Sequence, residues 1–192
     1  MVDLKRLTAE EFAATKYELP DGGRWVELIA GHVIALQSPS DVHGNVVLNF
    51  SKALAEHLQS ADVPGYACFD LGLVIARNPD TVRVPQVSYF TGGDRFAETD
   101  AMITETRPAL VVEVASTNDR RRQMGTRVRD YLNWGVKRVW IIDPVELLCF
   151  IHCLGGTVKR LSARDALSGD PLPAEFRVSV SDLFAEPKWW SG

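Results

Sequence analysis

The chain has 192 residues, of which 46% are hydrophobic and 24% charged, with a formal net charge of −4 and a pI near 5.6. This length and composition are typical of one globular domain, so we expect a single domain over residues 1–192, and the acidic balance excludes a general basic surface for nucleic acid. No apolar run approaches the roughly 20 residues of a membrane span and the N-terminus lacks a signal-peptide core, which predicts a cytoplasmic protein.

The N-terminal third predicts a short helix, a β-hairpin and a long helix. Thr8 and Glu11 have the spacing of a capping box, which indicates a helix start. Residues 24–29 and 32–37 alternate between apolar and polar side chains, as two strands joined at Ala30-Gly31 do. Residues 38–41 then supply cap residues for a long helix with one apolar face, formed by Val47, Phe50, Leu54 and Leu58.

The rest of the chain predicts alternating strands and helices. Residues 66–76 and 82–90 are expected to form two strands separated by the turn at 77–80, and the polar residues 91–106 a mobile surface loop. After them we expect, in order, a strand around residue 113, a helix over 119–134 closed by Gly135, a strand over 138–142, a hairpin turning at Gly155-Gly156, and a peripheral tail over 186–192.

Cys68, Cys149 and Cys153 do not form a disulfide framework. Cys149, His152 and Cys153 resemble a metal cluster by spacing alone. On a strand, however, residues four apart lie about 13 Å from one another, and His152 points to the opposite face. We therefore interpret the cysteines as packing residues.

Glu113 is one acid in the otherwise apolar run of residues 110–116. Burial of an unpaired carboxylate is costly, so a buried Glu113 must be paired with a cation or hold one. The alternative is an edge-strand glutamate that faces water, because buried carboxylates are rare. The strand–helix–strand order that follows Glu113 favours a functional role.

Six segments, taken together in this order, resemble the Uma family of bacterial proteins with the restriction-endonuclease-like PD-(D/E)xK fold. The segments are Leu7–Phe12, Trp25–Val33, Ser38–Gly44, Arg83–Ser88, Leu110–Ser116 and Tyr131–Pro144. The resemblance implies an α/β fold, in which a mixed β-sheet with the acidic motif on its central strands is flanked by helices and preceded by an N-terminal hairpin. It also implies a metal-dependent DNA endonuclease.

By this resemblance, the first acid of the motif falls at Gln86, the second at Glu113 and the lysine at Arg127. The simplest form of the motif has its lysine two residues after the second acid, where this chain has the apolar Ala115. The resemblance implies instead a lysine position on the following helix, which Arg127 occupies. Glu27 matches an acid often present near the N-terminus of this fold. A Mg²⁺ ion held by two carboxylates and a backbone carbonyl, here that of Val114, would neutralise the phosphate and activate water.

The chain departs from the motif at two positions. Gln86 offers an amide oxygen but no charge, so we expect weak Mg²⁺ binding, with Mn²⁺ somewhat tighter. Arg127 keeps the positive charge and can brace a phosphate, but it stays protonated and cannot act as the base. Together the departures favour a degenerate or repurposed site.

Other charged residues are candidates for supporting roles. Glu27 or Asp70 could supply the missing acid, and Asp94 is a poorer choice because it falls in the polar loop. His43 is interpreted as a structural or capping histidine, and Asp143 as a residue that caps a turn. The basic run at residues 120–122 suits phosphate contact, or it forms a solvated charged face.

These residues leave two main functional hypotheses open. The first is a Mg²⁺-dependent DNA endonuclease that uses Glu113, a borrowed acid and Arg127. The second is a catalytically silent nuclease fold that binds nucleic acid or a protein partner. A small-molecule enzyme lacks any supporting motif, and a homodimer remains open.

Overall fold

The computed structural model describes residues 6–60, 65–92, 98 and 100–187. The helices are α1 (Ala9–Thr15), α2 (Asp41–Ser60), α3 (Asn118–Trp134) and α4 (Val180–Leu183), with 3-10 turns η1 (Lys16–Glu18) and η2 (Pro20–Gly23). The strands are β1 (Val26–Ile29), β2 (His32–Ala35), β3 (Tyr66–Phe69), β4 (Gly72–Ala76), β5 (Thr81–Arg83), β6 (Val87–Phe90), β7 (Ile103–Thr104), β8 (Leu110–Val114), β9 (Arg138–Asp143), β10 (Leu148–His152), β11 (Lys159–Leu161), β12 (Ala166–Ser168) and β13 (Arg177–Ser179).

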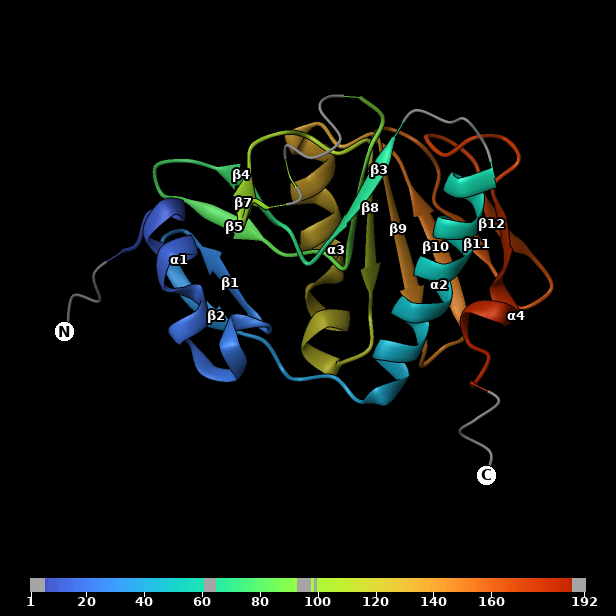
Figure 1. Ribbon diagram of the computed structural model, residues 1–192, viewed down its shortest axis with the longest axis horizontal. Helices are drawn as coiled ribbons and strands as arrows, with labels where there is room; N and C mark the ends of the chain where they lie inside the picture. The colour runs from blue at the N-terminus through green and yellow to red at the C-terminus, as the bar shows by residue number, and fades with distance from the viewer. Residues whose placement is uncertain (1–5, 61–64, 93–97, 99, 188–192) are drawn as a thin grey trace.

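In the described part of the chain, β12 and β13 form a separate two-stranded sheet, and the two main sheets lie side by side (Figure 1). The larger has the order β11-β10-β9-β8-β6-β3, and only its central pair β8–β9 is parallel. The smaller has the order β2-β1-β5-β4-β7 and begins with the predicted N-terminal hairpin. The expected mixed α/β architecture is confirmed.

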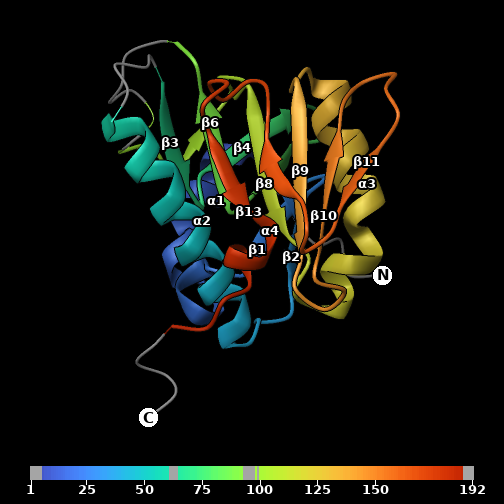
Figure 2. The same ribbon diagram turned by 90° about the vertical axis from the view of Figure 1, so that its right-hand side faces the viewer.

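Helices α2 and α3 cover opposite faces of the larger sheet (Figure 2). The side chains of β8 divide between them, because successive residues of a strand point to opposite faces. Val112 and Val114 pack in the core beneath α2, whereas Val111 packs in the core beneath α3. The same alternation turns Glu113 toward α3.

The predicted signals at the start of α1 and at the end of α3 are present. Thr8 and Glu11 form both hydrogen bonds of the capping box of α1. Helix α3 ends at Gly135, whose φ of 113° is in the left-handed region that a residue without a Cβ adopts at little cost. Phe50 and Leu54 are buried on the predicted apolar face of α2.

The prediction of two long strands over residues 66–76 and 82–90 was wrong. Each breaks in two, so that β3 and β6 pair in the larger sheet while β4 and β5 pair in the smaller one. The first break is at Asp70, which has a φ of 51°, and the second is at Pro85, which has no N–H for a ladder. The chain thus crosses between the sheets twice, and Asp70 and Gln86 lie at the crossing points.

The segment predicted as a surface loop contains a strand, because β7 pairs with β4 in parallel. Residues 93–97 and 99 of that segment, and residues 188–192 of the predicted tail, lie outside the described residues. Within the described residues the three cysteines are free, and Cys68 and Cys149 are buried. No described helix combines the length and the apolar character needed to cross a membrane.

Candidate active site

The candidate site begins where β6 and β8 run side by side. Val87 pairs with Val112 in an antiparallel register, so Gln86, one residue earlier, lies beside Glu113. The backbone N–H of Val114 donates to Oε1 of Gln86 at 2.8 Å. Gln86 is 2% exposed and Glu113 is fully buried. The two motif positions are therefore neighbours, and the amide oxygen of Gln86 already accepts a hydrogen bond.

Arg127 reaches this position from α3. Its Nε and Nη2 donate to Oε1 of Glu113 at 2.9 and 2.6 Å. Its Nη1 and Nη2 donate to Oε2 and Oε1 of Glu27 at 2.6 and 2.7 Å. All three side chains are buried, so one guanidinium bridges two carboxylates inside the protein.

Glu27 has further partners at the end of β5 and just after it. Arg83 donates from Nη1 to its Oε2 at 2.9 Å, and the N–H of Val84 donates to its Oε1 at 2.8 Å. Burial alone would raise the pKa of Glu27, but the guanidinium groups of Arg127 and Arg83 hold it at about 2. Glu27 is therefore ionised at neutral pH, and both of its oxygens are engaged.

Glu113 is held from α3 by a second side chain. The hydroxyl of Tyr131 donates to Oε1 at 2.6 Å, four residues and one helical turn after Arg127. Burial and the charge of Glu113 raise the pKa of Tyr131 well above its usual value. On the other side, Nη1 of Arg120 lies 3.6 Å from Oε2. Burial alone would lower the pKa of Arg127, but Glu113 and Glu27 raise it well above its usual value.

This arrangement does not fit a Mg²⁺ ion. Glu27 gives both oxygens to arginines and a backbone N–H, and Glu113 gives one oxygen to Arg127 and Tyr131. The oxygen of Gln86 that would face a cation accepts from Val114 instead. Among the described residues, no group of three or more His, Cys, Asp or Glu side chains is placed to hold a metal ion.

The predicted supporting residues that the structure describes have different settings. Asp70 lines a cavity together with Gln86, and burial raises the pKa of its carboxyl although Lys16, Arg120 and Arg24 oppose the rise. Asp94 lies outside the described residues. Asp143 accepts from the N–H groups of residues 145 and 146, which confirms that it caps a turn.

His43 has the structural setting that was predicted for it. Its Nδ1 is 2.7 Å from Oγ of Ser116, and its ring meets that of Trp25 edge-on at 5.5 Å. Burial, with a smaller contribution from the charge of Arg120, lowers the pKa of His43 to about 4. The imidazole is therefore neutral at physiological pH.

The basic run 120–122 divides into three environments. Arg120 is 2% exposed, and its guanidinium lies over the ring of Trp25 at 5.7 Å. Arg121 forms ion pairs with Asp143 and Glu146, and Arg122 is exposed. Neither sequence interpretation describes Arg120, because its position on the inner face of α3 is visible only once α3 and β8 are packed together.

Two members of the site were not singled out from the sequence. Tyr131 is four residues after Arg127, so both side chains lie on the same face of the helix. This spacing in the sequence predicts that they contact the same residue. Arg83 contacts Glu27 and donates from Nη2 to Asp130 at 2.7 Å, but 56 residues separate Arg83 from Glu27. No sequence pattern indicates that pairing.

Comparison with known proteins decides the family. Residues 9–181 match the Uma2 family, which is described as a putative restriction endonuclease. The chain belongs to the Uma2 family. It is also similar to a crystal structure described as a putative nuclease belonging to DUF820 from Anabaena variabilis, with a TM-score of 0.72 and 23% identity over 93% of this chain and 97% of that one. That likeness shows the nuclease-like fold. No curated protein matches the chain.

Family membership makes this Uma2 protein a relative of nucleases. The assignment of Gln86, Glu113, Arg127 and Glu27 as catalytic, and of Gln86, Glu113 and Val114 as metal ligands, stays a prediction, as do the Mg²⁺ or Mn²⁺ cofactor and a homodimer. Glu27, Glu113 and Arg127 are nevertheless brought into direct contact.

Proposed function

We propose that this Uma2 protein binds nucleic acid without hydrolysing it, as a nuclease fold whose acid pair is closed by an internal arginine. The observation that carries the proposal is the bridge from Arg127 to both Glu27 and Glu113, with four contacts of 2.6 to 2.9 Å. The guanidinium occupies the position between the acids where a divalent cation would otherwise be attracted.

The local charge supports this proposal. Two buried carboxylates, Glu27 and Glu113, face three buried guanidinium groups, those of Arg83, Arg120 and Arg127. A guanidinium does not lose its proton at ordinary pH, so it keeps its positive charge and cannot act as a general base. An approaching Mg²⁺ ion would therefore meet repulsion that a site with two free carboxylates does not present.

The binding part of the proposal is supported by the family and by local basic groups. DNA is the polymer on which a restriction endonuclease acts, and the overall charge of −4 restricts a contact to a local patch. Arg24 and Lys16 line adjoining cavities at the crossing between the two sheets. DNA is accordingly the expected partner.

A second candidate function, a Mg²⁺-dependent DNA endonuclease, is favoured by one observation. Asp70 follows Phe69, which pairs with Val87, so Asp70 lies beside Gln86 and adds a carboxylate next to the missing one. This endonuclease would use Asp70 and the oxygen of Glu113 that has no hydrogen bond within the described chain, Oε2.

One experiment separates the two functions. Supercoiled plasmid and labelled duplex oligonucleotides are incubated with the purified protein and Mg²⁺ or Mn²⁺, and binding is measured in parallel by fluorescence anisotropy at several salt concentrations. We expect binding that weakens as salt rises, without nicking. Cleavage by the wild type that is lost in a folded Glu113→Gln variant would overturn the proposal, as would the absence of binding at low salt.

A further inference from the structure

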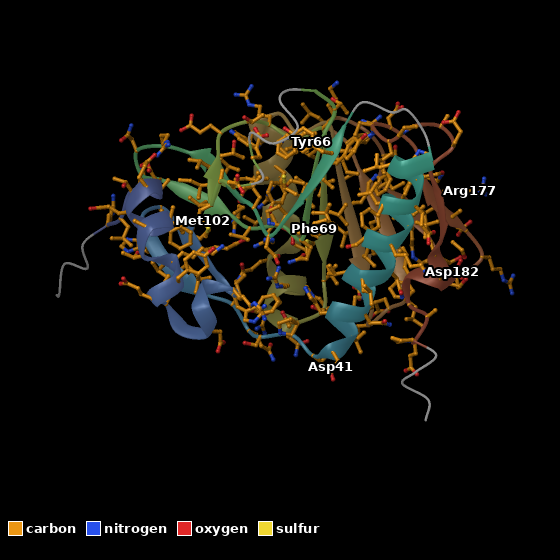
Figure 3. All side chains as sticks on the ribbon, viewed as in Figure 1. Asp41, Tyr66, Phe69, Met102, Arg177 and Asp182 are labelled. Carbon is orange, nitrogen blue, oxygen red and sulfur yellow. The ribbon has the colours of Figure 1, made fainter. Side chains whose placement is uncertain are left out.

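A cavity of about 410 Å³ lies apart from the buried acid pair. Its wall is formed by η1 and η2, by the end of β3 with the crossing at Asp70, and by residues of the segment before β7. Figure 3 shows Met102 on the side of the small sheet and Phe69 at the last residue of β3. Neither Glu27 nor Glu113 belongs to the lining, so this cavity is separate from the candidate active site.

Lys16 presents a primary amine to this cavity. The residue is 6% exposed, and its side chain has no hydrogen bond or ion pair in the described part of the chain. Its Nζ is nevertheless not one of the enclosed polar atoms without a partner, in contrast to Nε2 of Gln86 and Nε of Arg120. Because Lys16 belongs to the cavity lining, the cavity is where its unpaired amine is accessible.

The backbone of the neighbouring turn restricts the stem of Lys16. Gly23 has a φ of 70°, and a Cβ there would lie 2.6 Å from Cγ of Lys16 and 2.2 Å from its carbonyl oxygen. Only a residue without a side chain lets η2 fold this closely over Lys16. Packing has therefore already ordered part of the side chain, which reduces the entropy that it would lose when a ligand binds to the amine.

The same burial makes the amine more nucleophilic than that of an exposed lysine. Burial lowers the pKa of Lys16, because its charged form loses hydration, although the carboxylates of Asp70 and Glu27 act in the opposite direction. More of the neutral amine is then present at neutral pH. Only the neutral amine carries the electron pair that attacks an electrophile such as a carbonyl carbon.

The charges in the lining select against an ion. Lys16 and Arg24 are balanced by Asp70 and Glu98. The carboxylate of Glu98 also accepts from the hydroxyl of Tyr66. A charged ligand would lose its hydration here without meeting an excess of opposite charge, so the cavity suits a neutral ligand.

Two exposed aromatic rings belong to the cavity wall. Tyr17 is 72% exposed and Phe69 is 46% exposed. The hydroxyl of Tyr17 donates to Sδ of Met102, another wall residue, at 3.1 Å. Aromatic rings and a thioether make favourable contacts with a planar aromatic group. The cavity therefore combines an accessible amine with an uncharged surface for an aromatic ring.

We propose that this cavity binds a neutral aromatic aldehyde, and that Nζ of Lys16 forms a reversible imine with it. The electron pair of Nζ forms the C–N bond while the π pair of the carbonyl moves to oxygen, and a proton passes from nitrogen to that oxygen. The product takes up one proton from solvent and loses water, which leaves the protonated imine. No oxidant or reductant is needed, and the proposal is independent of the proposed function.

The first test compares the lysines of the wild-type protein. The probe is 2-hydroxybenzaldehyde, whose imine is detected by absorbance, and cyanoborohydride reduces the imine to a stable amine that peptide mass spectrometry locates. At neutral pH we expect Lys16 to be labelled about tenfold faster or more than the exposed Lys52, Lys137 and Lys159. The alcohol 2-hydroxybenzyl alcohol, which has the ring but no carbonyl, should protect Lys16 alone.

Two substitutions connect the reaction to the cavity. Lys16→Arg keeps the positive charge but forms no imine, so it should remove most of the imine absorbance, whereas Lys137→Arg should leave it unchanged. Phe69→Ala removes one exposed ring and should slow the labelling of Lys16 without a change at Lys52. Val42→Ala, at an exposed apolar residue outside the lining, is the matched control and should have no effect.

Two results would overturn the proposal. One is labelling of Lys16 at or below the rate of the exposed lysines. The other is labelling of Lys16 that neither 2-hydroxybenzyl alcohol nor Phe69→Ala affects, because the amine would then react without any binding of the ring. Both results would leave the proposed binding of nucleic acid to its own experiment.

Discussion

At the scale of single residues, an arginine at position 127 does what a lysine cannot do. A guanidinium presents five donors in a planar arrangement, whereas an ammonium is a compact charge on a flexible stem. Arg127 uses this shape to contact Glu27 through two nitrogens and Glu113 through two. This shape lets one side chain contact both buried acids at the same time.

Removal of Arg127 should strongly destabilise the fold. In Arg127→Met the buried carboxylates of Glu27 and Glu113 lose their shared cation, and loss of one partner of a buried ion pair costs about 3–5 kcal/mol. Urea unfolding followed by circular dichroism gives the free energy of unfolding. Arg129→Met, at an exposed position of the same helix, should change it by less than about 0.5 kcal/mol. Equal effects of the two variants would contradict the bridging role.

If the proposed function is right, restoring the acid and the lysine of the family motif should restore cleavage of DNA. Gln86→Asp adds a full negative charge beside Glu113 and should raise Mg²⁺ affinity, and Arg127→Lys replaces the bridging fork with a group that can lose a proton. The double variant should nick supercoiled plasmid, and each single variant should do so less, because groups that act on one phosphate are coupled.

The restoration experiment compares wild type, both single variants and the double variant at equal folded concentration, with Glu113→Gln in the double background as the control. A wild type that already nicks plasmid, and loses this activity in the double variant, would show that Gln86 and Arg127 are a working adaptation. The proposal that Arg127 makes the site inactive by bridging Glu27 and Glu113 would then be wrong.

At the scale of elements, helix ends were predictable from the sequence and strand breaks were not. Thr8, Glu11 and Gly135 act through local hydrogen bonds and backbone angles, which a few neighbouring residues determine. The breaks at Asp70 and Pro85 depend on which sheet each half of the strand joins. That pairing is determined by contacts with residues far away in the sequence. Apolar periodicity alone continues through both breaks.

Two glycines of α3 and its cap should respond to alanine with opposite signs. Gly135 has a φ of 113°, and a Cβ there would approach Arg107 at 3.3 Å, so Gly135→Ala should cost about 1 kcal/mol or more. Gly125 lies within the helix with nothing within 4 Å of an added Cβ, so Gly125→Ala should stabilise by about 0.5–1 kcal/mol. Thermal and urea unfolding of both variants provide the measurement, and destabilisation by Gly125→Ala would contradict the description of α3.

At the scale of the whole molecule, the site depends on packing that the sequence only partly reveals. The resemblance to the family placed Gln86, Glu113 and Arg127 in one region, and the register of β6 with β8 places the first two side by side. The contact of Arg83 with Glu27 and the burial of Arg120 follow from the way the small sheet and α3 meet. No pattern of neighbouring residues in the sequence predicts how this sheet and α3 pack against each other.

The stability of the whole molecule should depend on pH in two separate windows. The pKa of Glu27 is about 2 in the folded protein against 4.5 without the fold, so its contribution is fully present above about pH 4.5 and is lost as pH falls toward 2. The pKa of His43 falls from 6.5 to about 4, so the unfolded chain binds the extra proton first. Stability should therefore decrease already as pH falls from 6.5 toward 4.

The His43 window can be isolated by substitution. A shift from 6.5 to about 4 corresponds to a loss of about 2–3 kcal/mol across this range, at about 1.4 kcal/mol for each pH unit. His43→Gln has no proton to gain and should flatten the profile between pH 6.5 and 4.5, apart from a smaller slope from His152, whose pKa burial also lowers. His32→Gln, at a position on the N-terminal hairpin, serves as the matched control and should keep the wild-type slope. Urea unfolding at half-unit pH steps gives the profiles, and an unchanged slope in His43→Gln would show that His43 is not the group that binds the proton.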